Sequence, residues 1–292
     1  MLTKRAAEAA EFDEFYFSRY VGPSRYQRDE HWLGVFDAIA DRIVKDLQPR
    51  RVLDAGCAMG FLVEALRDRG VDAFGFDISD YALQHVRPDL RDYCWKASVD
   101  DALSEEYDLI VSIEVLEHVP ADVAERAVVN FAAHAPDVLF SSTPVDYKEA
   151  THLNVRPPEY WAELFAREGF FRDVDYDPTT YVSPWAIRYR RSREPVARLV
   201  AGYERLLWHL KQDSQAMREL NREQREELEA QQALVAEAEA ALEELRLIKG
   251  TVTWQAVHKL QEQLRRSIPA HTRRGRFLRV AARTVTRGSP GS

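Results

Sequence analysis

Between residues 50 and about 190, short apolar runs alternate with amphipathic stretches, and this alternation restricts the fold more than any other feature of the chain. Short apolar runs bounded by turn residues are typical of buried strands, whereas apolar residues three and four apart are typical of helices. Regular alternation of the two predicts an α/β fold, a doubly wound sheet with helices on both faces. The predicted strands are 51–54, 73–77, 93–97, 108–113, 138–142, 171–176 and 185–189, and the predicted helices are 61–69, 80–86, 121–134 and 158–168.

The length and composition leave room for more than this domain. The chain has 292 residues, of which 46% are hydrophobic and 30% are charged, enough for a domain of roughly 150 to 200 residues and a further segment. No stretch resembles a secretory signal or approaches the roughly 18 apolar residues that span a bilayer, which predicts a cytoplasmic protein. The two cysteines, Cys57 and Cys94, are too few for a disulfide framework or a zinc cluster, and both are predicted to be small buried residues.

Charge is distributed unevenly along the chain. The net charge is −8, but residues 265–292 contain eight arginines and no acidic residue, which leaves −16 for the rest. An acidic body disfavours a broad nucleic-acid interface. Phe277, Leu278, Ala281 and Val285 lie among these arginines, which predicts an amphipathic helix at the inner face of a membrane or against an acidic partner. A disordered basic end is the alternative.

A long stretch of helix-forming residues follows Pro195. Residues 196–249 contain no proline and a single glycine, Gly202, and their apolar residues recur at spacings of three and four. The heptad pattern shifts by four residues near Gln224, and several positions on the apolar seam are polar. The pattern predicts a long helix that forms a homo-oligomeric coiled coil through residues 203–245, with a solvated single helix as the alternative.

A glycine-rich turn joins the first predicted strand to the first predicted helix. In RVLDAGCAMG, Asp54 ends the strand, and Gly56 and Gly60 lie in the turn. Glycines at such a turn let backbone amides and the positive end of the helix approach a ligand closely. Asp77 ends the next strand, seventeen residues after Gly60, where a carboxylate can accept both ribose hydroxyls of a nucleoside. The spacing of the glycines does not fit the G-x-G-x-x-G turn of dinucleotide-binding oxidoreductases, and a simple tight turn is the structural alternative.

Residues 51–169 resemble a class I S-adenosylmethionine-dependent methyltransferase, a transferase family with a Rossmann-like fold and a seven-stranded sheet. The family pattern is an acid-x-Gly-x-Gly-x-Gly loop, an acid that ends the second strand, and a fourth strand similar to YDLIVSIEVLEHV, and all three occur here in order. The resemblance implies that the loop holds the methionine part of the cofactor, Asp77 the ribose, and Ile78 and Ser98 the adenine. The residues expected at the cofactor are Asp54, Gly56, Cys57, Ala58, Gly60, Asp77, Ile78, Ser98 and Glu114.

Ala58 departs from the family pattern because it replaces the middle glycine of the loop. An alanine disfavours left-handed backbone, so its methyl group is harmless only if the position has ordinary helical dihedral angles. The departure also leaves open a non-catalytic, methyltransferase-like protein whose coiled coil serves as a scaffold.

The stretch SIEVLEHVP combines two glutamates and a histidine at the end of an apolar run. Glu114 is expected at the carboxyl end of the fourth strand, the edge at which open α/β sheets bind ligands. Glu117 and His118 follow at i+3 and i+4, so one helical turn would bring the three side chains together. His152, in a later loop, is the fourth candidate. Carboxylate and imidazole ligands suit magnesium, manganese, iron or zinc, with positions left open for substrate.

The combination Glu-x-x-Glu-His with a later histidine resembles metal-assisted O-methyltransferases, among them ubiquinone-pathway and small-RNA 2′-O-methyltransferases. The resemblance implies a divalent cation, held by Glu114, Glu117, His118 and His152, that binds two neighbouring acceptor oxygens and lowers their pKa. Without a metal, the catalytic residues are expected to be His118, His152 and Glu117, with a histidine acting as general base and contributing about 10²- to 10⁴-fold. The structural alternative is that Glu117 caps a helix and His118 packs beneath it.

The segment before the first strand is rich in aromatic residues, namely Tyr16, Phe17, Tyr20, Tyr26 and Trp32. In the family that the chain resembles, this segment commonly folds over the cofactor, so it is expected to form a lid; a helix packed by its own aromatics is the alternative. The predicted parts are a lid at 1–48, a methyltransferase domain at 49–192, a long helix or coiled coil at 195–249, and short helices with a basic amphipathic tail at 250–292.

A methyltransferase domain followed by a long helix and a basic tail, together with the stretch SPWAIRYRRS, resembles bacterial surface-polysaccharide methyltransferases. The function expected on this resemblance is O-methylation of a sugar hydroxyl, with S-adenosylmethionine as cofactor and a glycan, glycolipid or surface polysaccharide as acceptor. The enzymatic alternative is O-methylation of a quinone-type or other small-molecule diol. RNA 2′-O-methylation ranks lower, because the acidic domain offers no basic groove with interleaved aromatics.

Overall fold

The computed structural model describes residues 12–22 and 24–267. The predictions made for residues 1–11 and for residues 268–292, which include most of the basic amphipathic tail, lie outside these described residues.

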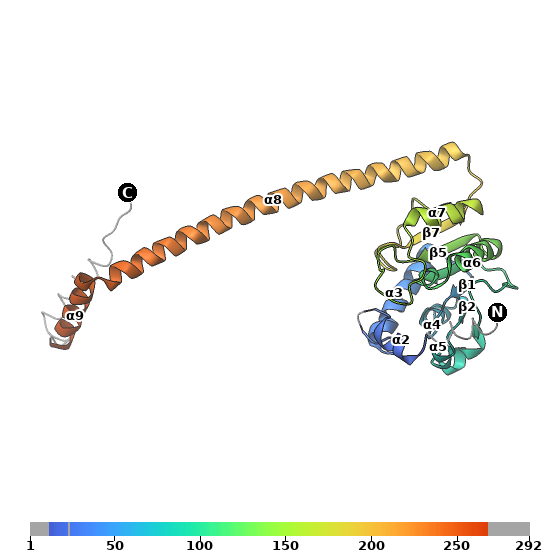
Figure 1. The fold of residues 1–292 in the computed structure, drawn as a ribbon, viewed down its shortest axis with the longest axis horizontal. Helices are drawn as coiled ribbons and strands as arrows, with labels where there is room; N and C mark the ends of the chain where they lie inside the picture. Colours follow the sequence, from blue (N-terminus) through green and yellow to red (C-terminus); the bar gives the residue numbers. More distant parts are fainter. Residues whose placement is uncertain (1–11, 23, 268–292) are drawn as a thin grey trace. The chain divides into compact units, whose positions relative to one another are not determined.

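The described residues form a seven-stranded sheet with the strand order β3-β2-β1-β4-β5-β7-β6. Figure 1 labels β1, β2, β5 and β7 of this sheet. The strands are β1 (Arg51–Ala55), β2 (Asp72–Asp77), β3 (Cys94–Lys96), β4 (Leu109–Ile113), β5 (Asp137–Ser141), β6 (Phe170–Arg172) and β7 (Ile187–Arg191). The first five strands of this order are parallel to one another, and β7 is antiparallel to both β5 and β6. The predicted doubly wound, Rossmann-like sheet is therefore confirmed, with an antiparallel pair at one edge.

Helices cover both faces of the sheet. They are α2 (Glu14–Arg19), α3 (Glu30–Asp46), α4 (Phe61–Arg67), α5 (Asp80–Gln84), α6 (Ala121–His134) and α7 (Pro158–Arg167), with short 3₁₀ turns η1 (Pro88–Tyr93) and η2 (Leu116–His118). Successive strand residues face opposite sides: Leu53 packs in the cluster with α6 and α7, whereas Val52 packs in the cluster with α3 and α4. Because both faces are buried, the central strands β1, β4 and β5 are mostly apolar, whereas β7 alternates apolar and charged residues.

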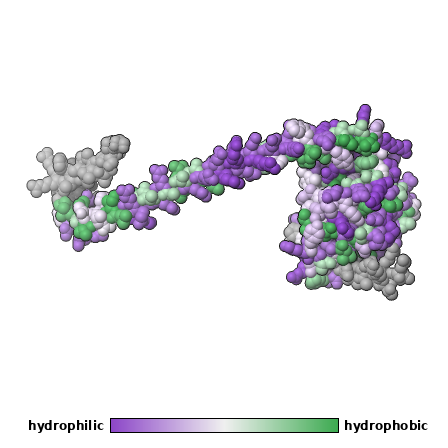
Figure 2. Space-filling view, turned by 45° about the horizontal axis from the view of Figure 1, so that its top comes forward, coloured by the Kyte–Doolittle hydropathy of each residue, from purple (hydrophilic) through white to green (hydrophobic). Residues whose placement is uncertain are grey.

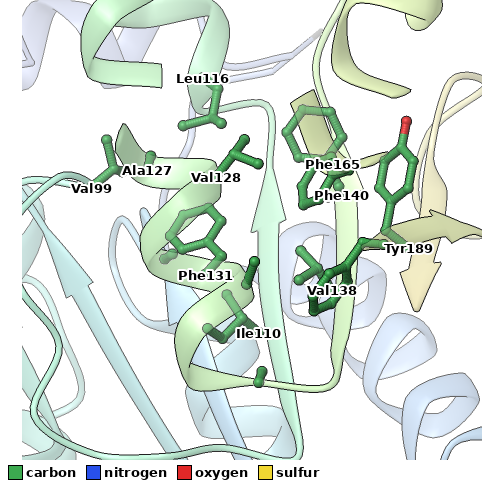
Figure 3. Packing of buried hydrophobic residues seen from close by; sticks show 14 of the residues in the cluster. Val99, Ile110, Leu116, Ala127, Val128, Phe131, Val138, Phe140, Phe165 and Tyr189 are labelled. Carbon is green, nitrogen blue, oxygen red and sulfur yellow. The ribbon is translucent and has the colours of Figure 1, made fainter. Parts of the chain in front are cut away.

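The α6 side of the sheet has an aromatic core (Figure 3). Phe131 of α6 lies near Ile110 and Val138 of the sheet, and all three are fully buried. Phe165 of α7 stacks on Tyr189 of β7 with ring centroids 4.1 Å apart. This packing fixes α7 and the antiparallel edge against β5, so the loop between β5 and α7 starts and ends on rigid elements.

The largest difference from the predicted elements lies at that antiparallel edge. The strand predicted at 171–176 ends at Arg172; beyond it, Asp173 still contacts β7, because its amide donates to the Arg188 carbonyl at 2.8 Å and its carboxylate pairs with the Arg188 guanidinium at 2.9 Å. The prediction for the two cysteines is half right, because Cys57 is buried while Cys94 is only partly buried; both are free.

The predicted long helix is confirmed as α8 (Val196–Gly250), followed by α9 (Val252–Ser267). Its first turns belong to the α/β unit, where buried Gly202 faces Val174 and the Tyr203 hydroxyl accepts a hydrogen bond from the Arg172 amide at 3.2 Å. A second compact unit begins at Trp208. In this unit α8 carries apolar residues among hydrophilic ones (Figure 2), and Leu210, Leu228 and Leu242 are 53–57% exposed. Within the described part of the chain, no helix has an apolar stretch sufficient to cross a membrane.

Candidate active site

A cavity of about 530 Å³ lies at the carboxyl ends of β1, β2 and β4, on the edge that the sequence predicted. Its volume is within the range of small-molecule sites. Of the predicted site residues, eleven line it, namely Asp54, Gly56, Cys57, Ala58, Asp77, Ile78, Ser98, Glu114, Glu117, His118 and His152. Gly60 does not line the cavity. It has φ +71° at the start of α4, where a Cβ would lie 3.3 Å from Val86, so its position serves the turn.

The loop after β1 approaches the cavity through its backbone. Gly56 has φ +90°, and a Cβ there would lie 2.4 Å from Val115, so only glycine fits. Asp54 is buried just before this loop, and burial, followed by the charge of Asp77, raises the pKa of the Asp54 carboxyl to about 8. A cation bound beside Asp54 would stabilise the ionised carboxylate and so lower its pKa.

Asp77 holds the same loop in place. Its carboxylate accepts a hydrogen bond from the Ala58 amide and another from the Ser79 amide, each at 2.8 Å. Burial raises the pKa of Asp77, and these backbone hydrogen bonds act in the opposite direction. Asp77 therefore stabilises the loop, in addition to its predicted contact with a ribose.

Ala58 does not have the ordinary helical dihedral angles under which its methyl group would be harmless. Its φ is +46°, in the left-handed region, where a non-glycine residue costs about 1 to 2 kcal/mol. The hydrogen bond to Asp77 and the buried surroundings keep the backbone in this state. Strain of this kind is found where the surrounding structure determines the backbone of a site.

Glu117 is fully buried in the 3₁₀ turn η2 and does not cap a helix. Its Oε1 accepts a hydrogen bond from the Thr143 amide at 3.2 Å, and its Oε2 is buried without a hydrogen-bond partner among the described residues. Burial and the charge of Glu114 raise the pKa of Glu117 well above its usual range. A proton or a cation at Oε2 would satisfy this orphan oxygen.

Glu114, whose charge acts on Glu117, has hydrogen-bond partners of its own in the loop before β7. It has φ +53°, and its Oε1 accepts hydrogen bonds from Trp185 Nε1 at 2.6 Å and from the Ser183 hydroxyl at 3.4 Å. Neither Ser183 nor Trp185 was predicted as a site residue. Both lie in the stretch SPWAIRYRRS, which was noted only for its resemblance to polysaccharide methyltransferases. Of the four predicted metal ligands, only Glu117, His118 and His152 have ligand atoms within 4.8 Å of one another.

The two histidines meet because the loop after β5 is tied to η2. The Glu117 carbonyl accepts hydrogen bonds from the amides of Leu153 and Asn154, each at 2.8 Å, which brings the ring of His152 to 4.7 Å from that of His118. Burial, followed by the nearby His152, lowers the pKa of His118 to about 4. His118 is therefore neutral at pH 7.

Loop residues that the sequence gave no reason to choose complete the contacts. His118 Nδ1 lies 3.1 Å from Thr151 Oγ1, and His152 Nε2 lies 3.3 Å from Glu149 Oε2. Asp146, Glu149 and His152 form a second group whose ligand atoms approach one another within 4.8 Å. No motif marks Glu149 or Thr151, because their partners lie across the cavity or in an irregular loop.

Aromatic residues of the N-terminal segment form one wall of the cavity. Tyr16, Phe17, Tyr20, Tyr26 and Trp32 all line it. The Tyr16 hydroxyl lies 3.3 Å from His118 Nε2, and burial raises the pKa of this phenol, so it remains a hydrogen-bond donor. The segment thus contacts the acidic and histidine cluster directly.

Comparisons with known proteins agree on the class of domain. Residues 25–172 match the model of a methyltransferase domain. The ubiquinone biosynthesis O-methyltransferase of Methylococcus capsulatus is 30% identical over 148 residues, which cover 48% of this chain and 62% of that protein. Its counterpart in Neisseria meningitidis is 32% identical over 122 residues, which cover 38% of this chain and 51% of that protein. The chain thus spans less than two thirds of the length of these curated relatives.

Among solved structures, magnesium protoporphyrin IX methyltransferase from Synechocystis PCC 6803 with bound SAH aligns with a TM-score of 0.49. That alignment covers 65% of this chain and 99% of the other, at 17% identity. The expected sugar acceptor is wrong, because the curated relatives are named for ubiquinone biosynthesis and thus favour the quinone-type alternative. The resemblance to polysaccharide enzymes rested on the long helix, the tail and the stretch SPWAIRYRRS, all of which lie outside the matched residues.

Proposed function

This chain belongs to the class I S-adenosylmethionine-dependent methyltransferase family, and from that membership we propose that it methylates a hydroxyl group of a quinone-type or other small-molecule diol. The observation that carries the proposal is that the cofactor loop after β1 and the Glu117–His118–His152 cluster line the same cavity. The relatives named for ubiquinone biosynthesis support the class of acceptor.

The cofactor side of the cavity suits S-adenosylmethionine. When bound, the cofactor supplies a sulfonium methyl group and leaves as S-adenosylhomocysteine. Asp54 is a buried carboxyl with a pKa of about 8, so the ammonium group of the methionine part would stabilise its charged form. Gly56 and Ala58 present backbone beside it, and the oxygens of Asp77 retain acceptor capacity for ribose hydroxyls.

The acceptor side suits an aromatic diol. Phe12, Tyr16 and Val145 give an apolar surface for a ring, while His118 and Glu117 lie beside it to receive a proton or orient a hydroxyl. His118 is neutral at pH 7, so a ring nitrogen is available as general base toward the acceptor hydroxyl. The acceptor oxygen then attacks the methyl carbon as the carbon–sulfur bond breaks, and the hydroxyl proton stays on the base.

We also propose that Glu117, His118 and His152 hold a divalent cation. The donor set fits such an ion, because their ligand atoms lie within 4.8 Å of one another and Glu117 Oε2 is buried without a partner among the described residues. Glu114 is a weaker ligand than expected, since Trp185 and Ser183 already bind its Oε1. A bound cation lowers the pKa of a coordinated acceptor oxygen, which is the chemistry that the site would gain.

Two measurements test the proposal. Calorimetric titration with S-adenosylmethionine should show binding to the wild type, strongly weakened binding to Asp77→Ala, and unchanged binding to Asp72→Ala, an exposed residue at the other end of β2. Incubation with catechol and hydroquinone-type acceptors should give a mass gain of one methyl group. Failure of the wild-type protein to bind the cofactor would refute the proposed function.

The role of the cation is tested separately with the same assay. Turnover should fall after thorough treatment with a chelator and return on addition of magnesium, manganese, iron or zinc. Full turnover after removal of divalent metal would refute the cation and leave His118 as the base.

For the long helix, we propose that α8 forms a coiled coil with a second copy of the chain through residues 203–245. Apolar residues at spacings of three and four, about half exposed, support this assembly. Leu242→Glu should lower the oligomeric state in light scattering, whereas Glu243→Gln on the same turn should not. A monomeric wild-type chain would refute this assembly.

A further inference from the structure

Resting on the proposed function, we infer that Thr151 and Glu149 are positioning residues that hold His118 in one tautomer, with its proton on Nδ1 and its Nε2 lone pair on the cavity side. Neither Thr151 nor Glu149 is among the site residues predicted from the sequence. Both lie in the loop between β5 and α7, which the Glu117 carbonyl anchors through Leu153 and Asn154.

The direction of the hydrogen bonds follows from counting protons. The Thr151 hydroxyl donates its only proton to Glu149 Oε1 at 2.6 Å. Thr151 Oγ1 can therefore act only as acceptor toward His118 Nδ1 at 3.1 Å, so Nδ1 carries the proton. A neutral imidazole has one N–H, which leaves Nε2 unprotonated. The Tyr16 hydroxyl, 3.3 Å from Nε2, is then the donor of that contact.

Glu149 also lies beside the second histidine, which a different group orients. Its Oε2 lies 3.3 Å from His152 Nε2, while His152 Nδ1 donates to the Asp146 carbonyl at 2.7 Å, since a carbonyl oxygen can only accept. The Glu149 and His152 side chains are 11% and 7% exposed, so little water competes for these contacts. A neutral imidazole has one N–H, so the Asp146 carbonyl orients the His152 ring, while Glu149 orients the His118 ring through Thr151.

The tautomer matters because Nε2 faces the place where an acceptor hydroxyl would lie. The phenol of Tyr16 already makes the hydrogen bond that a phenolic acceptor would make in its place. With the proton on Nε2 instead, the ring could neither accept a hydroxyl proton nor bind a cation at that nitrogen. Loss of the hydrogen-bond chain should therefore reduce kcat, about 10- to 100-fold, while the apolar wall keeps KM for the acceptor nearly unchanged.

The test uses nitrogen NMR of the histidine rings in the protein without cofactor or acceptor, with the His118 signals identified by their loss in His118→Asn. The wild type should show a protonated Nδ1 and an unprotonated Nε2. Thr151→Val and Glu149→Leu should move the proton to Nε2 in part of the population and lower kcat. Thr151→Ser, which keeps the hydroxyl, should restore both.

Thr179→Val is the matched control, because the Thr179 hydroxyl donates to Asp177 at 2.6 Å and neither residue lines the cavity. It should leave the His118 signals and kcat unchanged. A wild-type spectrum with the proton on Nε2, or an unchanged tautomer in Thr151→Val, would overturn the inference. Since the spectra need no turnover, the expected tautomer in a protein that methylates nothing would refute the proposed function alone.

Discussion

The cofactor side of the cavity is built mainly from backbone, whereas the acceptor side is built from side chains of three separate segments. On the cofactor side, Gly56 and Ala58 present main-chain groups, and Asp77 fixes them through amide hydrogen bonds. On the acceptor side, Tyr16 meets His118, and the loop around Glu149 closes the network. A site made of backbone recognises what all members of a family share, while a site made of side chains can change acceptor without disturbing the loop.

The strongest test of this division is to damage the acceptor side alone. His118→Asn removes the neutral ring that lies against Tyr16 and His152, so turnover should fall by about 10²- to 10⁴-fold. The affinity for S-adenosylmethionine should stay within about twofold, because the loop after β1 keeps its contacts. Steady-state kinetics and calorimetry measure the two effects. His134→Asn, at the end of α6, is the control; a parallel loss of cofactor affinity in His118→Asn would contradict the division.

The converse change damages the cofactor side. Asp77→Asn keeps the shape of the side chain, but its amide group would face the N–H of Ala58 or Ser79. The affinity for S-adenosylmethionine should fall about 10- to 100-fold, as expected for loss of one or two hydrogen bonds to a charged group. Titration calorimetry measures this loss, and kcat at saturating cofactor should be much less affected. Asp72→Asn, on the same strand, should bind normally, and equal weakening in both variants would point to general damage to β2.

In the absence of ligand, Asp54 should make the free energy of unfolding depend on pH. Its pKa is about 8 in the folded protein, above the value near 4 of an unfolded carboxyl, so the folded state binds the extra proton. The free energy of unfolding should therefore fall as pH rises from about 4 to about 8, by roughly 2 kcal/mol once relaxation of the buried site is allowed for. Urea denaturation of wild type and Asp54→Asn measures it, since the asparagine variant should lose most of this slope. An identical slope in both proteins would place the titrating group elsewhere.

The same division explains what the sequence could predict. Asp54, Gly56 and Asp77 were recognisable because each lies at the end of a buried strand, and strand ends of a parallel sheet meet at one edge. The strand predicted at 171–176 was too long: the β6–β7 pair ends at Arg172, and the ion pair of Asp173 with Arg188 is set by the tertiary fold. Such contacts leave no local period in the sequence.

On the acceptor side, fewer of the residues could be predicted from the sequence. Glu117 and His118 stood out because a helical spacing groups them, although the turn proved to be 3₁₀ and Glu114 binds Trp185 as well as lying close to Glu117. Glu149 and Thr151 had no such signal. Their importance depends on donor and acceptor directions that only the folded loop defines.

Ala58 gives the smallest and most local test of the cofactor side. Its φ of +46° is held by the hydrogen bond to Asp77, so the methyl group stores strain that a glycine would release. Ala58→Gly should raise the free energy of unfolding by about 1 kcal/mol, less the added entropy of a glycine in the unfolded chain. Cofactor affinity should change little, because the amide that Asp77 holds is unaltered. Ala55→Gly, in buried β1, is the control and should destabilise. A destabilised Ala58→Gly would mean that packing of the methyl group outweighs the strain, and that the alanine supports the loop rather than merely being tolerated there.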